Sequence, residues 1–146
     1  MVLNVKIITK DPTLLPKYQT IGAAGMDIHS NNSDPLVMKP GQRVLVPSGL
    51  YIELPVGVEA QIRPRSGLAL KHGITVLNSP ATIDSDYRGE YLVLLINHGQ
   101  ESYTIQPGDR IAQVIFAKYE TVEWQIVSEI IESSTRSKKG FGSTGS

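Results

Sequence analysis

The spacing of the prolines limits this chain more than any other feature. Nine prolines stand at positions 12, 16, 35, 40, 47, 55, 64, 80 and 107, so few windows before residue 108 can hold a long helix. Between them lie short runs of β-branched and aliphatic residues, which are bounded by Gly, Pro, Asn or Asp. Such runs are typical of a β-sandwich or barrel. We predict strands at 5–8, 43–46, 50–54, 58–62, 91–96, 103–105 and 111–116.

One segment has the pattern of a helix, and two have the pattern of tight turns. The sequence predicts a short helix at Ser66–His72, with Ser66 as its N-cap and Gly73 at its end. Residues 97–100 and 106–109 each contain a glycine, which can supply a positive φ angle. We therefore predict a hairpin turn at each of these two places.

The C-terminal part of the chain changes character. Residues 122–131 fit the hydrophobic periods of both a strand and a helix. Apolar residues alternate from Val122 to Ile126, as in a strand, whereas the apolar residues that follow also fit a helix. We predict a strand for this segment. Beyond them the sequence is rich in Ser, Gly and Lys and has too few apolar residues to form a core. We predict a β-domain at 1–132 and a flexible C-terminal arm at 133–146.

Composition excludes several classes of function. The chain has 146 residues, enough for one domain, and its 14 Lys and Arg balance its 14 Asp and Glu. A broad basic surface for nucleic acid or an anionic membrane is therefore not expected. Without cysteine there is no disulfide, thiolate metal site or cysteine nucleophile. No apolar run is long enough to span a membrane, and no secretory signal pattern is present, so we predict a cytoplasmic protein.

Two segments carry side chains suited to a nucleotide. Arg63–Gly67 combines two guanidinium groups and a hydroxyl with the start of the predicted helix, which favours phosphate, although a capped helix beside surface arginines has the same pattern. Asn78–Gly89 contains Asp84 and Asp86. One carboxylate could be a general base while the other holds a cation such as Arg88, or both could cap a turn.

The remaining polar residues are less specific. Asp27, Asp109 and Arg110 each suit an ion pair or a turn, and the three histidines lack the spacing of metal ligands. In the tail, Phe141 lies between glycines and Arg136 has hydroxyl residues nearby. Such a tail is either a flexible terminus or a segment that stacks on a ring and binds phosphate.

Five segments in this order resemble the five motifs of the trimeric deoxyuridine triphosphatases, the dUTPases. The match extends over residues 23 to 145, and a set of five motifs in order is far more specific than any one of them. The segments are 23–28 (AAGMDI), 63–69 (RPRSGLA), 78–89 (NSPATIDSDYRG), 108–115 (GDRIAQVI), and Arg136 with 140–145 (GFGSTG).

The resemblance implies a fold, an assembly and a reaction. The fold would be an all-β, jelly-roll-like barrel or sandwich with one short helix. Three subunits would form a homotrimer whose active sites are shared between subunits. The reaction would be hydrolysis of dUTP to dUMP and pyrophosphate by water attack at the α-phosphorus, with Mg²⁺ on the triphosphate. Such an enzyme limits uracil incorporation into DNA and supplies dUMP for dTMP synthesis.

The resemblance also assigns residues to the nucleoside and to the phosphates. Asp84 would deprotonate the attacking water, and Asp27 would assist through a metal-bound water. Asn78 would bind the edge of uracil, Phe141 would stack on it, and Tyr87 would pack beneath the deoxyribose and exclude a ribose. The expected phosphate contacts are Arg65, Ser66, Gly67, Gln113, Arg136, Ser143 and Thr144, and further substrate contacts are Thr82, Ile83 and Gly142.

One residue departs from the family pattern, and two other functions remain open. Ala81 stands where the family has glycine, and a Cβ there would be costly if the position needed a positive φ. A dCTP deaminase shares the fold, but it needs a glutamate as proton shuttle, whereas this chain has Asp84 and the Phe141 tail. A non-catalytic nucleotide-sensing regulator is the second alternative, because a fold alone does not determine function.

Overall fold

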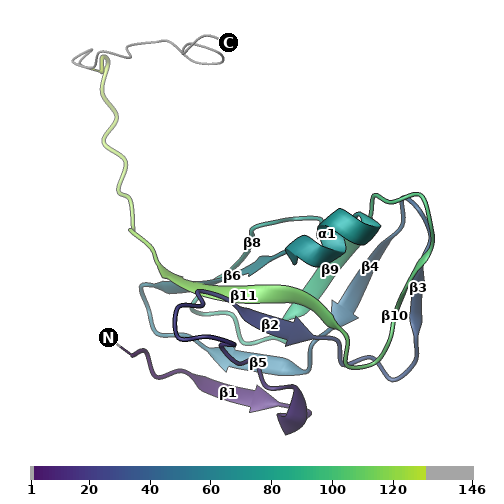
Figure 1. The fold of residues 1–146 in the computed structure, drawn as a ribbon. Coiled ribbons are helices and arrows are strands. Elements are labelled where there is room, and N and C mark those ends of the chain that lie inside the picture. Colours follow the sequence, from purple (N-terminus) through teal and green to yellow (C-terminus); the bar gives the residue numbers. More distant parts are fainter. Residues whose placement is uncertain (1, 131–146) are drawn as a thin grey trace.

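The computed structural model describes residues 2–130, whose regular structure is almost entirely β-strand (Figure 1). The seven strands predicted between residues 5 and 116 are present within one or two residues, and the all-β class is confirmed. A 3-10 turn at Pro12–Leu14 and one helix, α1 (Ser66–His72), complete the regular structure. The strands are β1 (Lys6–Thr9), β2 (Met26–His29), β3 (Leu36–Met38), β4 (Arg43–Pro47), β5 (Leu50–Glu53), β6 (Val58–Arg63), β7 (Ile74–Val76), β8 (Ala81–Ile83), β9 (Leu92–Asn97), β10 (Tyr103–Ile105) and β11 (Arg110–Lys118).

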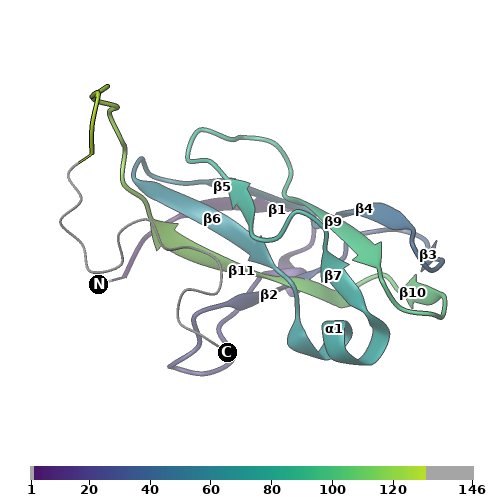
Figure 2. The same ribbon diagram turned by 90° about the horizontal axis from the view of Figure 1, so that it is seen from above.

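Most strands pair with partners that are distant in the sequence. The largest sheet has the order β2-β11-β6-β8, a second has the order β4-β9-β7, and β1-β5 and β3-β10 form two short ribbons (Figures 1 and 2). Every pair is antiparallel. Such long connections between antiparallel strands are typical of jelly rolls. The predicted hairpins at 97–100 and 106–109 are therefore wrong: both segments turn, but the strands that flank them pair with other strands.

The core lies between the sheets and is formed by the inward-facing residues of each strand. Along β6, Val58, Ala60 and Ile62 are buried while the residues between them are not, which is the alternation expected of a strand with one covered face. Val93 and Leu95 of β9 are buried in the same way. The register of β6 is therefore fixed by burial, because a slip of one residue would expose its apolar side chains.

Helix α1 has the predicted range but not the predicted cap. Arg65 occupies the N-cap position without a side-chain cap bond, and Ser66 is the first helical residue, so Ser66 as N-cap is wrong. The helix ends at Gly73 as predicted, with φ of 67°, and the Gly73 N–H donates to the carbonyl of Ala69. A Cβ at Gly73 would also lie 2.5 Å from the backbone nitrogen of Gly99. Gly73 therefore ends the helix and also allows the turn at 97–100 to pack closely against it.

Residues 119–130 leave the body of the molecule as an extended segment (Figure 1). The strand predicted at 122–131 is wrong for residues 122–130, which have no regular structure. The alternating residues Val122, Trp124 and Ile126 are 63%, 87% and 98% exposed. A strand needs a partner edge, and these side chains find no cover within the described chain. Residue 131 and the predicted arm at 133–146 lie outside the described residues, so the proposed domain division stays a prediction.

Candidate active site

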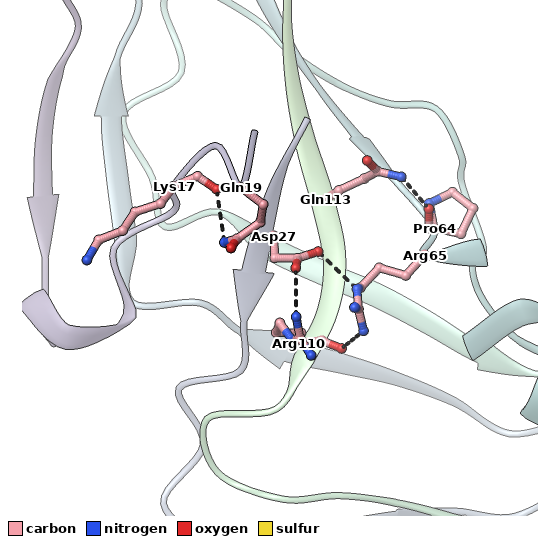
Figure 3. Close-up of polar contacts among 7 residues, drawn as sticks. All are labelled: Lys17, Gln19, Asp27, Pro64, Arg65, Arg110 and Gln113. Carbon is pink, nitrogen blue, oxygen red and sulfur yellow. Dashed lines mark hydrogen bonds and ion pairs between the residues drawn. The ribbon is translucent and has the colours of Figure 1, made fainter. Parts of the chain in front are cut away.

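The first group of predicted site residues meets around the carboxylate of Asp27, on β2. Its Oδ1 accepts a hydrogen bond from Nε of Arg65 at 2.9 Å, and its Oδ2 lies 3.5 Å from Nη1 of Arg110 (Figure 3). The side chains of Asp27 and Arg65 are only 18% and 26% exposed. The ion-pair reading of Asp27 and Arg110 is confirmed, whereas Asp109 is a turn residue that accepts from the N–H of Gln106.

Strand β11 holds the chain segment that leads into α1. The backbone carbonyl of Arg110 accepts a hydrogen bond from Nη1 of Arg65 at 3.2 Å. Nε2 of Gln113 donates to the carbonyl of Pro64 at 3.0 Å (Figure 3). Asp27 and Gln113 are directly opposed in the β2–β11 ladder. We call Asp27, Arg65, Arg110 and Gln113 the Asp27 cluster, in which three segments of the chain are joined by side-chain bonds.

Gly25 provides the space that Gln113 occupies. A Cβ at position 25 would lie 2.5 Å from Oε1 of Gln113. A side chain at position 25 would therefore displace the Gln113 carboxamide from its bond to Pro64. The sequence contains no signal for this contact, because the two residues are 88 positions apart (113 minus 25).

The start of α1 faces solvent beside the Asp27 cluster. Ser66 and Gly67 are exposed, and no side chain caps the first turn. The free N–H groups at a helix start can bind an anion. A Cβ at Gly67 would meet no atom within 4 Å, so this surface is open to a ligand.

The second group of predicted residues lies in the loop 84–89, which follows β8 and which we call the Asp84 loop. The N–H of Tyr87 donates to the carbonyl of Asp84 at 3.2 Å, so a turn intervenes between Asp84 and Asp86. Nη1 of Arg88 donates to the carbonyls of Ser85 and Tyr87 at 2.7 and 2.9 Å. Of the two alternatives for this segment, the one in which an aspartate holds Arg88 is therefore wrong. The Asp84 carboxylate is exposed and bonds to none of the described residues.

Tyr87 and Asn78 lie on either side of β8 in the sequence. The Tyr87 hydroxyl donates to the carbonyl of Glu90 at 3.0 Å, and its ring packs closely over Gly89, where a Cβ would clash. Asn78 is exposed, in the turn closed by the bond from the N–H of Ser79 to the carbonyl of Val76. Both residues are therefore accessible to a ligand. Thr82 is also exposed, whereas Ile83 is 9% exposed and belongs to the core.

Ala81 fits its position without strain. It is the first residue of β8 and pairs with Ile62 of β6 in an antiparallel ladder. The extended backbone of a strand is open to any L-residue, so the penalty expected for a positive φ does not arise. The peptide bond between Ser79 and Pro80, just before it, is cis.

The Asp27 cluster and the Asp84 loop lie toward opposite ends of β6. Gln113 is opposite Arg63, whereas Ile83 is opposite Ala60. At about 3.3 Å per residue, Ala60 and Arg63 are about 10 Å apart along the strand, and the chain leads Asp84 and Arg65 further apart at either end. The structure therefore brings together Asp27, Arg65 and Gln113 but does not bring Asp84 to them.

Five of the predicted site residues lie outside the described part of the chain. Arg136, Phe141, Gly142, Ser143 and Thr144 lie outside the described residues. Within residues 2–130, no three His, Cys, Asp or Glu side chains are grouped so as to hold a metal ion. In the same range, no helix is long and apolar enough to cross a membrane.

Comparison with known proteins identifies the family. The profile of the dUTPase family matches residues 11–145. The deoxyuridine 5'-triphosphate nucleotidohydrolase of Cytophaga hutchinsonii is 57% identical over 99% of this chain and 94% of its own length. A dUTPase of Staphylococcus bacteriophage 80alpha, solved with dUPNHPP, superposes with a TM-score of 0.88 at 22% identity over 99% of this chain and 100% of its own. A mutant dUTPase of phage phi11 has a TM-score of 0.78 at 19% identity over 88% of this chain and 99% of its own, and is described as coordinating a structural Mg(II) ion. This chain belongs to the dUTPase family.

Proposed function

We infer that this chain hydrolyses dUTP to dUMP and pyrophosphate. The observation that carries this inference is the family match over residues 11–145, which spans both the Asp27 cluster and the Asp84 loop. The relative at 57% identity has the name of this activity. In a cell, the reaction limits uracil incorporation into DNA and supplies dUMP for dTMP synthesis. The cytoplasmic location stays a prediction.

Asp84 is the group that activates water. Its carboxylate is exposed and is not engaged by any described residue, so it is free to accept a proton. As the water loses this proton to Asp84, its oxygen forms a bond to the α-phosphorus. The bond from the α-phosphorus to the bridging oxygen breaks, and pyrophosphate leaves with the electron pair. Phosphoryl transfer of this kind depends on positioning and charge stabilisation more than on covalent catalysis.

The Asp27 cluster and the start of α1 bind the phosphates. Arg65 is kept in one orientation by Asp27 and by the Arg110 carbonyl, so part of its conformational entropy is lost before substrate arrives. The N–H groups at Ser66 and Gly67 provide further donors. Gln113 holds Pro64 and contacts the phosphates from β11.

The segment around the Asp84 loop binds the nucleoside. The exposed carboxamide of Asn78 offers a donor and an acceptor to the edge of uracil, together with the backbone at Thr82 and Ile83. The Tyr87 ring, fixed by its bond to the Glu90 carbonyl, packs beneath the deoxyribose. A ring held there leaves no room for a ribose 2′-hydroxyl.

The described residues fit a magnesium ion that is carried by the substrate. Mg²⁺ retains several waters and needs few protein ligands when phosphates bind it, so the lack of an acidic cage within residues 2–130 is consistent with it. Both oxygens of Asp27 are engaged by arginines, which favours contact with the ion through a water. When bound, the ion neutralises phosphate charge.

A homotrimer with shared sites explains the separation of the two groups. One chain holds the Asp27 cluster and the Asp84 loop toward opposite ends of β6. If a neighbouring chain places its Asp84 loop beside this Asp27 cluster, each site contains both groups. A ring of three chains repeats this contact three times and closes.

The outer face of the β4-β9-β7 sheet supports such an assembly. Leu45 pairs with Leu94 and Pro47 with Leu92, so these side chains lie on one face, opposite to the buried Val46 and Val93. Leu45 and Leu92 are 54% and 40% exposed in the single chain. A contiguous apolar surface of this kind is typical of a contact between subunits.

The tail residues complete the proposed site. We assign Phe141 to stacking on uracil, Arg136, Ser143 and Thr144 to the terminal phosphate, and Gly142 to a further contact with the substrate. Deletion of residues 136–146 should therefore leave the trimer intact by light scattering but remove most dUTP hydrolysis. An unchanged rate would exclude the tail from the site.

The function is tested by following two products at once. The protein is incubated with dUTP and, separately, with dCTP in the presence of Mg²⁺, and pyrophosphate and ammonia are assayed. Release of pyrophosphate from dUTP without ammonia supports the inference. Ammonia from dCTP without pyrophosphate would instead identify a deaminase.

A further inference from the structure

The Asp84 loop has few bonds to the rest of the chain. Its main hydrogen bonds are internal, from Tyr87 to Asp84 and from Arg88 to the carbonyls of Ser85 and Tyr87. One contact between the hydroxyls of Ser85 and Tyr119, at 3.3 Å, joins it to the residue that follows β11. The position of the loop therefore depends on its two ends, which are β8 before it and Glu90 after it.

Glu90 is bound through both oxygens of its carboxylate. Oε1 accepts the N–H of Gly49 at 2.8 Å, and Oε2 accepts Nζ of Lys10 and the hydroxyl of Tyr51, both at 3.2 Å. The Glu90 side chain is only 16% exposed. Burial raises the pKa of Glu90, but the three donors lower it further, so its pKa lies below the ordinary value. The carboxylate is therefore ionised at neutral pH. It is bound by Gly49 in the β4–β5 turn, by Lys10 just after β1, and by Tyr51 on β5.

The backbone of Glu90 is bound to the Asp84 loop at the same time. Its carbonyl accepts the Tyr87 hydroxyl at 3.0 Å, and the next N–H, of Tyr91, donates to the carbonyl of Leu50 at 2.8 Å. Glu90 is thus fixed to the body of the molecule by its side chain and to the Tyr87 ring by its carbonyl. A shift of Glu90 must move Tyr87.

We propose that Glu90 is a positioning residue for dUTP hydrolysis, which holds the Asp84 loop so that Asp84 meets the water and Tyr87 meets the deoxyribose. The inference rests on the proposed function, in which these two residues act on the substrate. Glu90 itself contacts no reacting atom and acts only through the loop. Its partners are 39, 41 and 80 residues away in the sequence, so no local motif indicates this role.

The test compares Glu90→Ala with Glu53→Ala. Glu53 also pairs with a lysine, Lys6 at 3.1 Å, but its side chain is 49% exposed and it bonds to no residue of the loop. In Glu90→Ala, we expect kcat for dUTP to fall by up to about 100-fold, because a displacement of about 1 Å can have this effect. The ratio of kcat/KM for dUTP to that for UTP should also fall, because a displaced Tyr87 excludes ribose less well. Glu53→Ala should match the wild type in both quantities.

A conservative variant and a measurement without substrate complete the test. Glu90→Gln keeps an acceptor for the Gly49 N–H and should recover most of the dUTP selectivity. If Glu90→Ala does not fold, Tyr51→Phe removes one donor and should show the same loss of selectivity on a smaller scale. In the ligand-free protein, amide hydrogen exchange of residues 84–89 should be faster in Glu90→Ala than in Glu53→Ala.

The outcomes separate this inference from the proposed function. If the wild type is active and Glu90→Ala keeps its kcat, its selectivity and its exchange rates, the positioning role is wrong. A loss of kcat with unchanged selectivity and exchange also overturns it. If the wild type fails to hydrolyse dUTP, the proposed function and its positioning residue both fall. Faster exchange of residues 84–89 would then show only that Glu90 anchors the loop.

Discussion

The Asp27 cluster and the Asp84 loop differ in how much of their bonding is complete without a ligand. In the cluster, both carboxylate oxygens of Asp27 are paired, and Arg65 and Gln113 each bond to a backbone carbonyl. In the loop, the Asp84 carboxylate bonds to no described residue. The side chains of the cluster are therefore held in place without a ligand, whereas the Asp84 side chain is not held by any described residue.

The folding of the two regions explains this difference. Asp27, Arg110 and Gln113 of the cluster lie on β2 and β11, neighbours in the largest sheet, where the register of the ladder places Gln113 opposite Asp27. The loop follows β8, a strand of three residues at the edge of this sheet, and the chain then enters β9 of the second sheet. In the proposed mechanism, strands therefore position the binding groups, and a loop with an anchored end positions the base.

Removal of the base should have the largest effect. Asp84→Asn should still bind dUTP but should hydrolyse it about 100- to 10,000-fold more slowly, the usual contribution of a general base. The rate is measured under single-turnover conditions, and binding by calorimetry. Asp86→Asn, a change in an exposed carboxylate two residues away, is the control and should remain active. Near-normal turnover by Asp84→Asn would exclude Asp84 as the base.

A mixing experiment tests whether the two regions work in different chains. Asp84→Asn damages only the loop, and Arg65→Gln damages only the cluster. If the two proteins are unfolded together and refolded at equal amounts, a site has an intact cluster and an intact loop by chance in about one quarter of cases in a closed ring of three. Activity should therefore rise to about a quarter of wild type from two nearly inactive proteins. Should the mixture stay inactive although it refolds as trimers, the site is contained in one chain.

Much of the fold was predictable from local sequence, but the site was only partly so. Proline and glycine positions indicated seven of the strands and the end of α1 at Gly73, whereas the short strands β2, β3, β7 and β8 were not predicted. The strand prediction at 122–130 failed because periodicity indicates which side chains alternate but not whether a partner edge exists. The contact of Gly25 with Gln113 and the three donors to Glu90 depend on pairing between distant segments, which has no local pattern.

A substitution at Gly25 should loosen the cluster without unfolding the protein. In Gly25→Ala, the new Cβ would lie 2.5 Å from Oε1 of Gln113 and should push the carboxamide away from Pro64. Because the displaced group is the end of a flexible side chain, we expect a loss of stability of only about 1 kcal/mol. KM for dUTP should rise by about tenfold, which corresponds to 1.4 kcal/mol of binding. Gly22→Ala, where a Cβ meets no atom within 4 Å, is the matched control for kinetics and for thermal unfolding.

Acid should weaken the anchor of the loop before it affects the strand ladders, and this is the smallest of the expected effects. The donors from Gly49, Lys10 and Tyr51 outweigh burial and leave the pKa of Glu90 below 4.5, so its contribution to stability is complete above that value and is lost as pH falls through the folded-state pKa. The pKa of Lys10 is raised above 10.5 by its bonds to Glu90 and Tyr51, so this partner stays charged throughout the acid range.

Urea unfolding at neutral pH and at about pH 3.5 should show a larger loss of stability in the wild type than in Glu90→Gln. Asp11, whose pKa is lowered by Thr13, contributes equally to both proteins and cancels in the comparison. Equal losses in the two proteins would mean that ionisation of Glu90 does not hold the loop, and the anchor would then depend only on the shape of the side chain.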